Sequence, residues 1–290
     1  MPSLKEIKTR IQSVRSTRKI TSAMMMISSS KLRKTQKITE NLYPYQQKLQ
    51  QLMELFVNSQ NDFTSPYVER RPIKRVAVIA FSSNTGLAGR FNDNVIAQLK
   101  DTVNNYLHLG KENIQIYPVG DKVREAARKM GFETTTNFHA IADKPSYEAT
   151  QQLASDVMDL FLKKKLDKVE LIFHHYKSKS TQELVQETFL PITLNTPEEK
   201  WNIPELDYIV EPDPQTIMEQ LIPKTLKLKL YTVHTDSVSS EHAARTIAMQ
   251  TATDNADDLL DDLTLQHNKL RQQSITNELL DIIGGSFGRD

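Results

Sequence analysis

The sequence has 290 residues, with 37 Lys and Arg against 36 Asp and Glu, so its formal net charge is +1. This balance argues against a dedicated nucleic-acid binder, which usually carries a strong basic excess. Cysteine is absent, which excludes disulfides, thiolate nucleophiles and cysteine-ligated zinc. No apolar run approaches the ~18 residues of a membrane-spanning helix, so we expect a soluble protein.

The N-terminal segment is predicted to be one long helix. From Ser3 to Tyr43 the sequence has neither Gly nor Pro, a run of 41 residues that far exceeds the usual helix length. Apolar residues recur at steps of three and four at Leu4, Ile7, Ile11 and Val14, and again at Leu42, Tyr45, Leu49, Leu52 and Phe56. Between Val14 and Ile38 this register slips, which predicts a relaxed supercoil, and Pro44 predicts a local bend.

The same segment is strongly basic. Residues 1–39 contain ten Lys or Arg and one acid, whereas residues 254–290 contain eight acids and three bases. A basic, amphipathic, acid-poor N-terminus fits either an organelle transit peptide or a helix whose basic face meets acidic partners, including the chain's own C-terminal helix. We favour the second interpretation because the heptad pattern continues past residue 50 without a cleavage-like break.

The middle of the chain alternates predicted strands and helices. The predicted strands are Val76–Phe81, Ile114–Val119, Val169–Phe173 and Leu184–Ile192. The predicted helices are Asn94–Leu107, Lys122–Lys129 and Tyr147–Leu162. The first strand is continuously apolar, which is typical of a buried parallel strand. Strands that alternate with helices predict βαβ units and a parallel sheet.

A turn from Ser82 to Asn92 follows the first strand, where a nucleotide-binding domain would place its phosphate loop. Its glycines, Gly86 and Gly89, have G-x-x-G spacing, so the turn lacks both the dinucleotide-binding fingerprint and the P-loop lysine. We interpret it as a structural turn and expect no cofactor. The histidines show no metal-ligand spacing, and His174 and His175 should point to opposite faces of a strand, so no metal site is predicted.

The C-terminal segment is predicted to be the longest helix. From Lys224 to Ile283 the sequence again has neither Gly nor Pro, a run of 60 residues. Steps of three and four alternate without a slip through Met249, Ala252, Ala256, Leu259, Leu263, Gln266 and Leu270. This heptad seam predicts two helices that wrap around each other, and Ala252 and Ala256 would allow a close approach of the partner helix.

Three segments are therefore expected. They are an N-terminal helix over residues 1–70, an α/β domain over residues 71–205 and a C-terminal helix over residues 206–290. Four prolines between Pro197 and Pro214 predict an extended linker that leads into the last helix.

Distinctive motifs lie at both ends of the chain and in the turn after the first strand. The N-terminal motifs are IKTRIQSV (7–14), TRKITSAM (17–24) and SKLRKTQ (30–36). The later motifs are GLAGRFN (86–92), SEHAAR (240–245), ATDNA (252–256), NKLRQ (268–272), ITNEL (275–279) and the final GG (284–285). In this order the motifs resemble those of the gamma-subunit family of F-type ATP synthases, most closely at the two ends.

The resemblance implies a long antiparallel coiled coil of the N- and C-terminal helices, with a Rossmann-like α/β domain between them. It also implies a central rotor stalk. The coiled-coil tip would enter a ring of three alpha and three beta subunits, and the α/β domain would rest on the epsilon subunit and the membrane c ring. Proton flow through the c ring would turn the stalk and drive ATP synthesis at the beta subunits.

In this role the chain would itself be non-catalytic, without a cofactor or metal and without nucleic acid. As a bacterial member of the family, it would lie peripherally on the cytoplasmic face of the inner membrane. By position in the family, Arg271, Gln272 and Thr276 would contact a loop of the beta subunit, with Met24 near that contact. Weaker candidates for contacts with acidic partner surfaces are Lys31, Arg33 and Lys34.

Two other classes of protein remain open from the residues. One is a nucleotide-binding α/β protein with helical extensions, which tight ATP binding by the isolated chain would favour. The other is a coiled-coil adaptor or nucleic-acid binder that uses the basic N-terminal helix. Steeply salt-dependent nucleic-acid binding would favour that second class.

Overall fold

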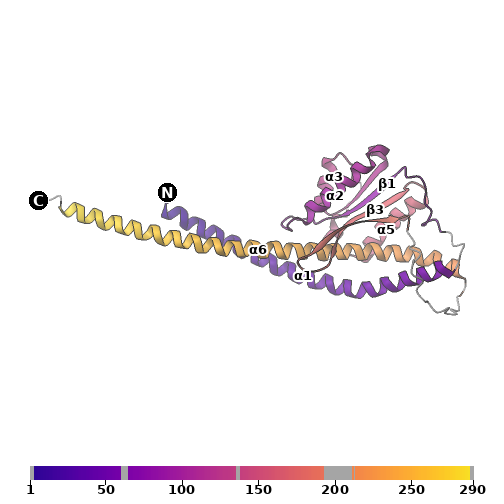
Figure 1. The fold of residues 1–290 in the computed structure, drawn as a ribbon, viewed down its shortest axis with the longest axis horizontal. Helices are drawn as coiled ribbons and strands as arrows, with labels where there is room; N and C mark the ends of the chain where they lie inside the picture. Colours follow the sequence, from indigo (N-terminus) through magenta and orange to yellow (C-terminus); the bar gives the residue numbers. More distant parts are fainter. Residues whose placement is uncertain (1–2, 60–64, 135–137, 193–210, 212, 288–290) are drawn as a thin grey trace. The chain divides into compact units, whose positions relative to one another are not determined.

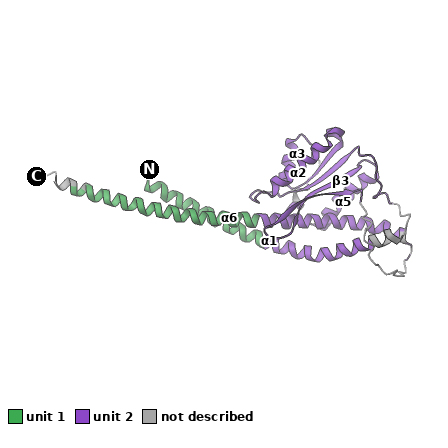
Figure 2. Cartoon of the chain, viewed as in Figure 1, with its two compact units in different colours: residues 1–29, 245–290 green, residues 30–244 purple. Residues whose placement is uncertain are grey.

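The computed structural model describes residues 3–59, 65–134, 138–192, 211 and 213–287 of the chain. The chain begins with the long helix α1 (Leu4–Ser59) and ends with the long helix α6 (Pro214–Phe287), and all four described strands lie between them in the sequence (Figure 1). The chain divides into two compact units, one of residues 1–29 with 245–290 and the other of residues 30–244 (Figure 2). The first is called here the coiled-coil unit and the second the sheet unit.

The two long helices begin with local hydrogen bonds that the sequence encodes. At the start of α1, the Ser3 N–H donates to Glu6 Oε2 at 2.8 Å and the Glu6 N–H donates to Ser3 Oγ at 3.3 Å, which is a reciprocal capping box. At the start of α6, Asp213 accepts from the N–H and the hydroxyl of Thr216. Pro214 occupies the first helical position, where its missing N–H costs nothing. The prolines before it lie outside the described residues, so the predicted linker stays a prediction.

The sheet unit contains a four-stranded sheet in the order β2-β1-β3-β4. Its strands are β1 (Val76–Phe81), β2 (Ile114–Val119), β3 (Lys168–Tyr176) and β4 (Gln182–Leu190). Strand β1 pairs in parallel with both β2 and β3, as predicted. The fourth strand differs, because β4 runs antiparallel to β3. Only a short connection separates β3 from β4, which permits a hairpin but is too short for a parallel crossover.

Helices cover both faces of the sheet. The principal ones are α2 (Phe91–Tyr106), α3 (Asp121–Lys129) and α5 (Tyr147–Leu162). A cluster with Val78, Val95 and Leu99 packs α2 and α3 against one face, while a cluster with Ile79, Val157 and Phe161 packs α5 against the other (Figure 1). All six residues of β1 are buried because both faces of that strand are covered.

The first half of α6 also belongs to the core of the sheet unit. Met218, Ile222, Leu226, Leu230 and Val233 are buried in the same cluster as α5. We expected an α/β domain over 71–205 and a separate C-terminal helix over 206–290. The compact units have other boundaries. The sheet unit extends along α6 to Ala244.

The buried positions of α1 correct the predicted slip in its register. Between Val14 and Ile38 the buried residues are Thr21, Ser28, Leu32 and Thr35, and their steps of seven, four and three keep the helical phase. The prediction of a slip was wrong because the seam is polar in this stretch, while the apolar Ile20, Met26 and Ile27 are more than half exposed. Farther along the helix, Leu49 and Met53 are buried, whereas Tyr45 and Leu52 of the predicted stripe are exposed.

Candidate functional site

Antiparallel pairing of α1 and α6 organises the coiled-coil unit. The hydroxyls of Thr21 and Thr253 are 2.8 Å apart, and Arg18 Nε lies 2.5 Å from Asp257 Oδ1. A step towards the N-terminus on α1 therefore matches a step towards the C-terminus on α6. Thr253 also donates from its hydroxyl to its own helix at Met249 O, at 2.8 Å, so it has two hydrogen-bond partners.

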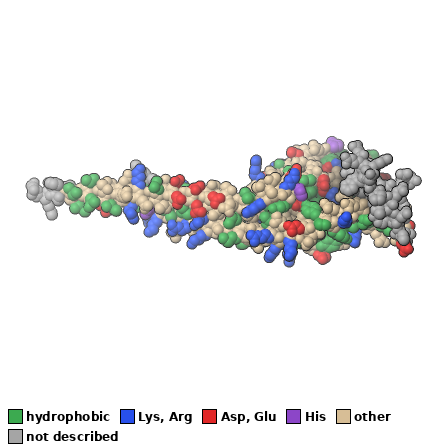
Figure 3. Space-filling model, turned by 60° about the horizontal axis from the view of Figure 1, so that its bottom comes forward, with side chains coloured by type: hydrophobic (Ala, Val, Ile, Leu, Met, Phe, Trp, Pro, Cys, Tyr) green, Lys and Arg blue, Asp and Glu red, His purple; other side chains and the backbone are tan. Residues whose placement is uncertain are grey.

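Opposite charges face each other along this pairing. The basic residues of α1 and the acidic residues that follow Thr253 on α6 come from the two oppositely charged ends of the sequence. Figure 3 shows Lys and Arg side chains beside Asp and Glu side chains along the paired helices. The Arg18–Asp257 pair is about half exposed, so each such pair is worth no more than about 1 kcal/mol. The charges therefore favour the antiparallel arrangement without dominating its stability.

The seam of α6 is only partly the predicted one. Met249, Ala256 and Leu263 are buried, as expected, but Leu259 and Gln266 are exposed. The partly buried neighbours Thr253, Leu260 and His267 lie inward instead. Sequence periodicity found the correct heptad, and Ala252 is partly buried, but Leu259 and Gln266 each stand one residue before the inward position.

The C-terminal end of α6 presents apolar side chains to solvent. In this register Leu4, the first residue of α1, lies level with about Arg271, so no residue of α1 is left to pair with α6 beyond that level. The exposed apolar residues there are Ile275, Leu279, Leu280, Ile282 and Ile283. Apolar side chains on several sides of one helix mark a surface that a partner covers. The heptad pattern does not include these residues, and their departure from it is the sequence signal that identifies them.

The predicted contact residues fall into separate places. Arg271, Gln272 and Thr276 are exposed on α6, and the Thr276 hydroxyl donates to Gln272 O at 2.9 Å, so Gln272 and Thr276 lie one turn apart with Arg271 next to Gln272. Met24 is partly buried on α1 and lies level with about Gln250, roughly 30 Å along the helix from Arg271. The structure therefore does not bring Met24 next to the other three. The basic residues Lys31, Arg33 and Lys34 are exposed on α1 within the sheet unit.

The turn after β1 is held by its own side chains. The carboxamide oxygen of Asn92 accepts from the backbone N–H and the hydroxyl of Ser83, each at 3.0 Å. The N-terminus of the neighbouring helix α3 is also occupied, because Asp121 N–H donates to Asn84 Oδ1 and Val123 N–H donates to Ser82 Oγ. A phosphate would need such donors. This geometry supports the interpretation as a structural turn.

Positive φ angles occur within this turn and at Gly120, which directly follows β2 and lies next to the turn. Leu87 and Gly89 both have positive φ, and the Leu87 side chain is 64% exposed. Gly120, at the end of β2, has φ +111°, and a Cβ there would lie 2.1 Å from Ser82 O. Gly120 therefore allows β2 and the turn to approach each other closely.

The adjacent histidines of β3 point to opposite faces of the sheet, as expected. His174 is buried and stacks on Phe91 of α2 at 4.5 Å, and its burial lowers its pKa to about 4. His175 faces α6, where its Nδ1 lies 2.6 Å from Asp236 Oδ2. Among the described residues no three His, Cys, Asp or Glu side chains come together as a metal site would require.

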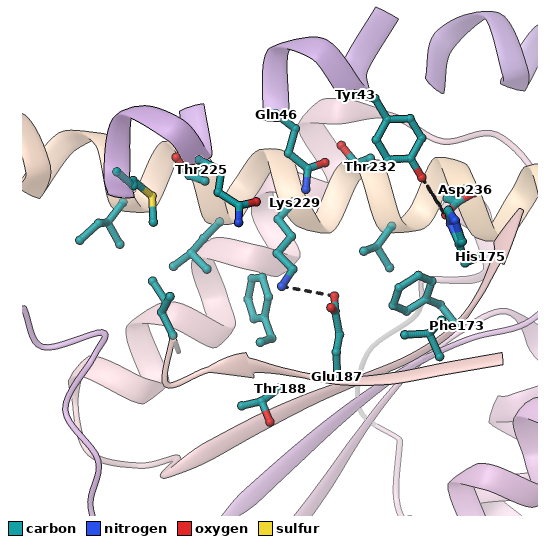
Figure 4. Close-up of a pocket in the computed structure, with 18 residues that line it drawn as sticks. Tyr43, Gln46, Phe173, His175, Glu187, Thr188, Thr225, Lys229, Thr232 and Asp236 are labelled. Carbon is teal, nitrogen blue, oxygen red and sulfur yellow. Dashed lines mark hydrogen bonds and ion pairs between the residues drawn. The ribbon is translucent and has the colours of Figure 1, made fainter. Parts of the chain in front are cut away.

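The Asp236 carboxylate is the centre of a small network that the sequence analysis missed. It accepts a hydrogen bond from the Tyr43 hydroxyl at 3.1 Å (Figure 4) and another from the Tyr176 N–H at 3.0 Å. Burial raises the pKa of Asp236, while its hydrogen bonds oppose that shift. Burial also raises the pKa of Tyr43, and the nearby Asp236 charge adds to the shift. No sequence motif marks these residues, since they lie on three separate elements.

Comparison with known proteins covers nearly the whole chain. Residues 3–287 match the family model described as ATP synthase. The chain is 52% identical over 290 residues to the ATP synthase gamma chain of Bacteroides fragilis strain ATCC 25285, covering 99% of this chain and 100% of that one. It is 39% identical to the ATP synthase gamma chain of Flavobacterium johnsoniae, over 99% and 98% of the two chains.

Solved structures show the same fold at lower sequence identity. A chain of the Euglena gracilis mitochondrial ATP synthase, in a structure of OSCP, F1 and c-ring, matches with a TM-score of 0.63 and 17% identity. That match covers 98% of this chain and 94% of the other. Across the described residues, no helix combines the length and the apolar character that crossing a bilayer demands.

Proposed function

Because the chain belongs to the ATP synthase gamma chain family, we propose that it is the central rotor stalk of an ATP synthase. In this role it turns inside a ring of three alpha and three beta subunits, rests on the epsilon subunit and the membrane c ring, and transmits the rotation that couples proton flow to ATP synthesis. The chain transmits torque and leaves the chemistry to the beta subunits. The exposed apolar side chains near the end of α6, among them Ile275, Leu280 and Ile282, are the observation that best supports a shaft held by other subunits.

The contact residues follow from the same proposal. Arg271, Gln272 and Thr276 lie within two successive turns of α6 and are exposed, and a forked guanidinium beside a carboxamide suits a carboxylate-bearing loop of a beta subunit. Met24 would contact a partner subunit at a separate place, about 30 Å from Arg271 along the helix axis. Lys31, Arg33 and Lys34 provide a basic surface for acidic partners. The complex would hold this chain peripherally on the cytoplasmic face of a bacterial inner membrane.

Rotation of the chain tests this function directly. The sequence contains no cysteine, so Asp101→Cys on the exposed surface of α2 provides one attachment point for an optical probe. In a complex with alpha and beta subunits immobilised through beta, ATP should drive rotation of the probe in one direction, with three equivalent pauses per turn because there are three beta sites. A complex that hydrolyses ATP while the probe stays still would refute the rotor role.

A further inference from the structure

A cavity of about 540 Å³ lies within the sheet unit, between the long helices and the antiparallel edge of the sheet. Its volume is in the range of small-molecule sites, about 300–1,000 Å³. Figure 4 shows Gln46 and Thr225 on the helix side and Glu187 and Thr188 on the strand side. This cavity has no part in the proposed rotor function, so it calls for its own explanation.

Regular spacing on each element builds the lining. On α1, Gln46, Gln50 and Met53 are four and three residues apart and share one face of the helix. On α6, Ile222, Leu226 and Lys229 do the same. Strand β4 adds alternate residues, Val185, Glu187 and Phe189, which point to one side of a strand. The lining therefore combines apolar side chains with about as many polar and charged ones.

The charged groups of the lining are already paired. Lys229 Nζ lies 3.3 Å from Glu187 Oε1, and the Asp236 carboxylate is held by His175 and Tyr43 (Figure 4). A charged ligand would find no uncompensated opposite charge here and would lose its hydration on entry. The lining thus disfavours ions.

Two neutral polar atoms of the lining are buried without a hydrogen-bond partner. They are the amide oxygen of Gln46 and the hydroxyl oxygen of Thr225, on α1 and α6. The Thr225 side chain belongs to a residue that is only 9% exposed. Buried polar atoms are nearly always satisfied, so unsatisfied ones that line a cavity indicate what its occupant supplies. The Gln46 oxygen requires a donor, and the Thr225 hydroxyl can either donate or accept.

We propose that this cavity binds a small neutral amphiphile, with an apolar body of a ring or short chain and one amide or hydroxyl group that bonds to Gln46 and Thr225. The apolar body contacts Phe189, Ile222 and Leu226. The ligand bridges α1, α6 and β4, so its binding raises the thermal stability of the sheet unit.

A matched pair of probes tests this chemistry on the full chain in complex with alpha and beta subunits. The probes are 4-butylbenzamide and 4-butylbenzoate, which share a shape and differ in charge. Titration calorimetry should give saturable binding of the amide with a Kd below about 1 mM, as expected for a ligand of this size. The carboxylate should bind at least about tenfold more weakly, because its charge has no partner in the cavity.

Variants of the two unpaired groups locate the site. Thr225→Val keeps the side-chain shape and Gln46→Leu removes the amide, and each should weaken amide binding about threefold to tenfold. Val185→Trp should fill the cavity and abolish binding. The controls Gln47→Leu, on an exposed position of α1, and Thr264→Val, in the coiled-coil unit, should bind normally.

Circular dichroism and the unfolding midpoint verify that each variant folds. Because Thr225→Val is isosteric, it remains informative if Gln46→Leu fails to fold. The proposal is wrong if the amide does not bind saturably, if the two probes bind equally, or if Thr225→Val and Val185→Trp bind like the wild type. Rotation is measured separately, so a failure here leaves the rotor role unaffected.

Discussion

The Nδ1 atom of His175 lies 2.6 Å from the Oδ2 atom of Asp236, so one buried carboxylate joins strand β3 to helix α6. The same carboxylate accepts from Tyr43 of α1, which brings a third element into the contact. Within the sheet unit, a single side chain thus fixes both long helices to the sheet. Its loss leaves three partly buried polar groups without their acceptor, and such groups are more costly unpaired than a single hydrogen bond is favourable.

Asp236→Ala should therefore destabilise the chain by about 3 kcal/mol or more, since His175, Tyr43 and the Tyr176 N–H lose their acceptor together. Tyr43→Phe removes a single hydrogen bond to the carboxylate and should cost only about 1–2 kcal/mol. Urea unfolding of the two variants measures the difference. Equal costs would show that the carboxylate does not act as a shared acceptor.

Acid should destabilise the chain through His174. Burial lowers its pKa to about 4, below the ordinary value of 6.5, so the folded state resists protonation while the unfolded state accepts it. The stability that His174 contributes is present above about pH 6.5 and is lost as the pH falls towards 4. Buried His234, whose pKa is also lowered to about 4, acts in the same direction. Burial raises the pKa of Asp236, so that group acts in the opposite direction.

His174→Phe isolates this effect, because Phe keeps the stacking on Phe91 and cannot be protonated. Between pH 7.5 and pH 4 the wild type should lose about 2–3 kcal/mol more stability than the variant. Unfolding midpoints across this range measure the difference, and His108→Phe, at an exposed position, is the control. Parallel pH profiles for wild type and His174→Phe would contradict the prediction.

The pairing of the terminal helices should be captured by one cysteine pair. Thr21→Cys with Thr253→Cys replaces two side chains whose hydroxyls touch at 2.8 Å, so mild oxidation should form an intramolecular disulfide. The absence of natural cysteines makes the product unambiguous. Thr21→Cys with Thr264→Cys, about three turns away on α6, should not form one. Electrophoresis without reductant distinguishes the products, and cross-linking of the control pair alone would disprove the register.

Two leucines that are two residues apart test the seam of α6. Leu263 is 3% exposed and Leu265 is 73% exposed. Leu263→Ala should destabilise the coiled-coil unit by about 2–5 kcal/mol, whereas Leu265→Ala should change its stability by no more than about 0.5 kcal/mol. Amide hydrogen exchange along α6 measures both changes. A larger loss of protection from Leu265→Ala would show that the seam lies on the other side of the helix.

Torque transmission should depend on the exposed turn at Arg271. If charge-assisted hydrogen bonds to a beta subunit form at only one rotary angle, their loss raises the barrier by about 1.5–3 kcal/mol. Arg271→Ala with Gln272→Ala should then reduce ATP hydrolysis by the assembled complex about 10–100-fold. Lys163→Ala, at the exposed end of α5, is the matched charge control. Normal turnover and normal proton pumping in the double variant would show that this turn carries no torque.

Much of the fold could be predicted from periodicity and breakers. Runs free of Gly and Pro located both long helices, and the apolar runs located β1 and β2 at their observed bounds. The absence of helix breakers and the apolar pattern are both local signals. A strand buried on both faces is apolar throughout, and a helix with one buried face has apolar residues on that face. The motifs at the two ends are also contiguous stretches of sequence, so the family resemblance could be identified from them directly.

Local patterns failed where contacts come from distant segments. The seam of α1 continues through Thr21, Ser28 and Thr35, polar residues that an apolar count passes over. From Thr232 to Ala243, α6 is buried on all sides although it is rich in Ser, Thr and His. These residues are accommodated because their hydrogen bonds go to their own helix or to neighbours such as His174 O and Thr150.

Local residue patterns and composition were enough to identify the two long helices, the first strands of the sheet, the absence of thiol chemistry and the family. Three features emerged only from the folded chain: the first half of α6 completes the core of the sheet unit, Asp236 joins three elements, and Gln46 and Thr225 line one cavity. The physical reason is that burial and hydrogen bonding of these groups depend on segments that are up to about 190 residues apart. Such contacts produce no periodic residue pattern in either of the two segments that they join.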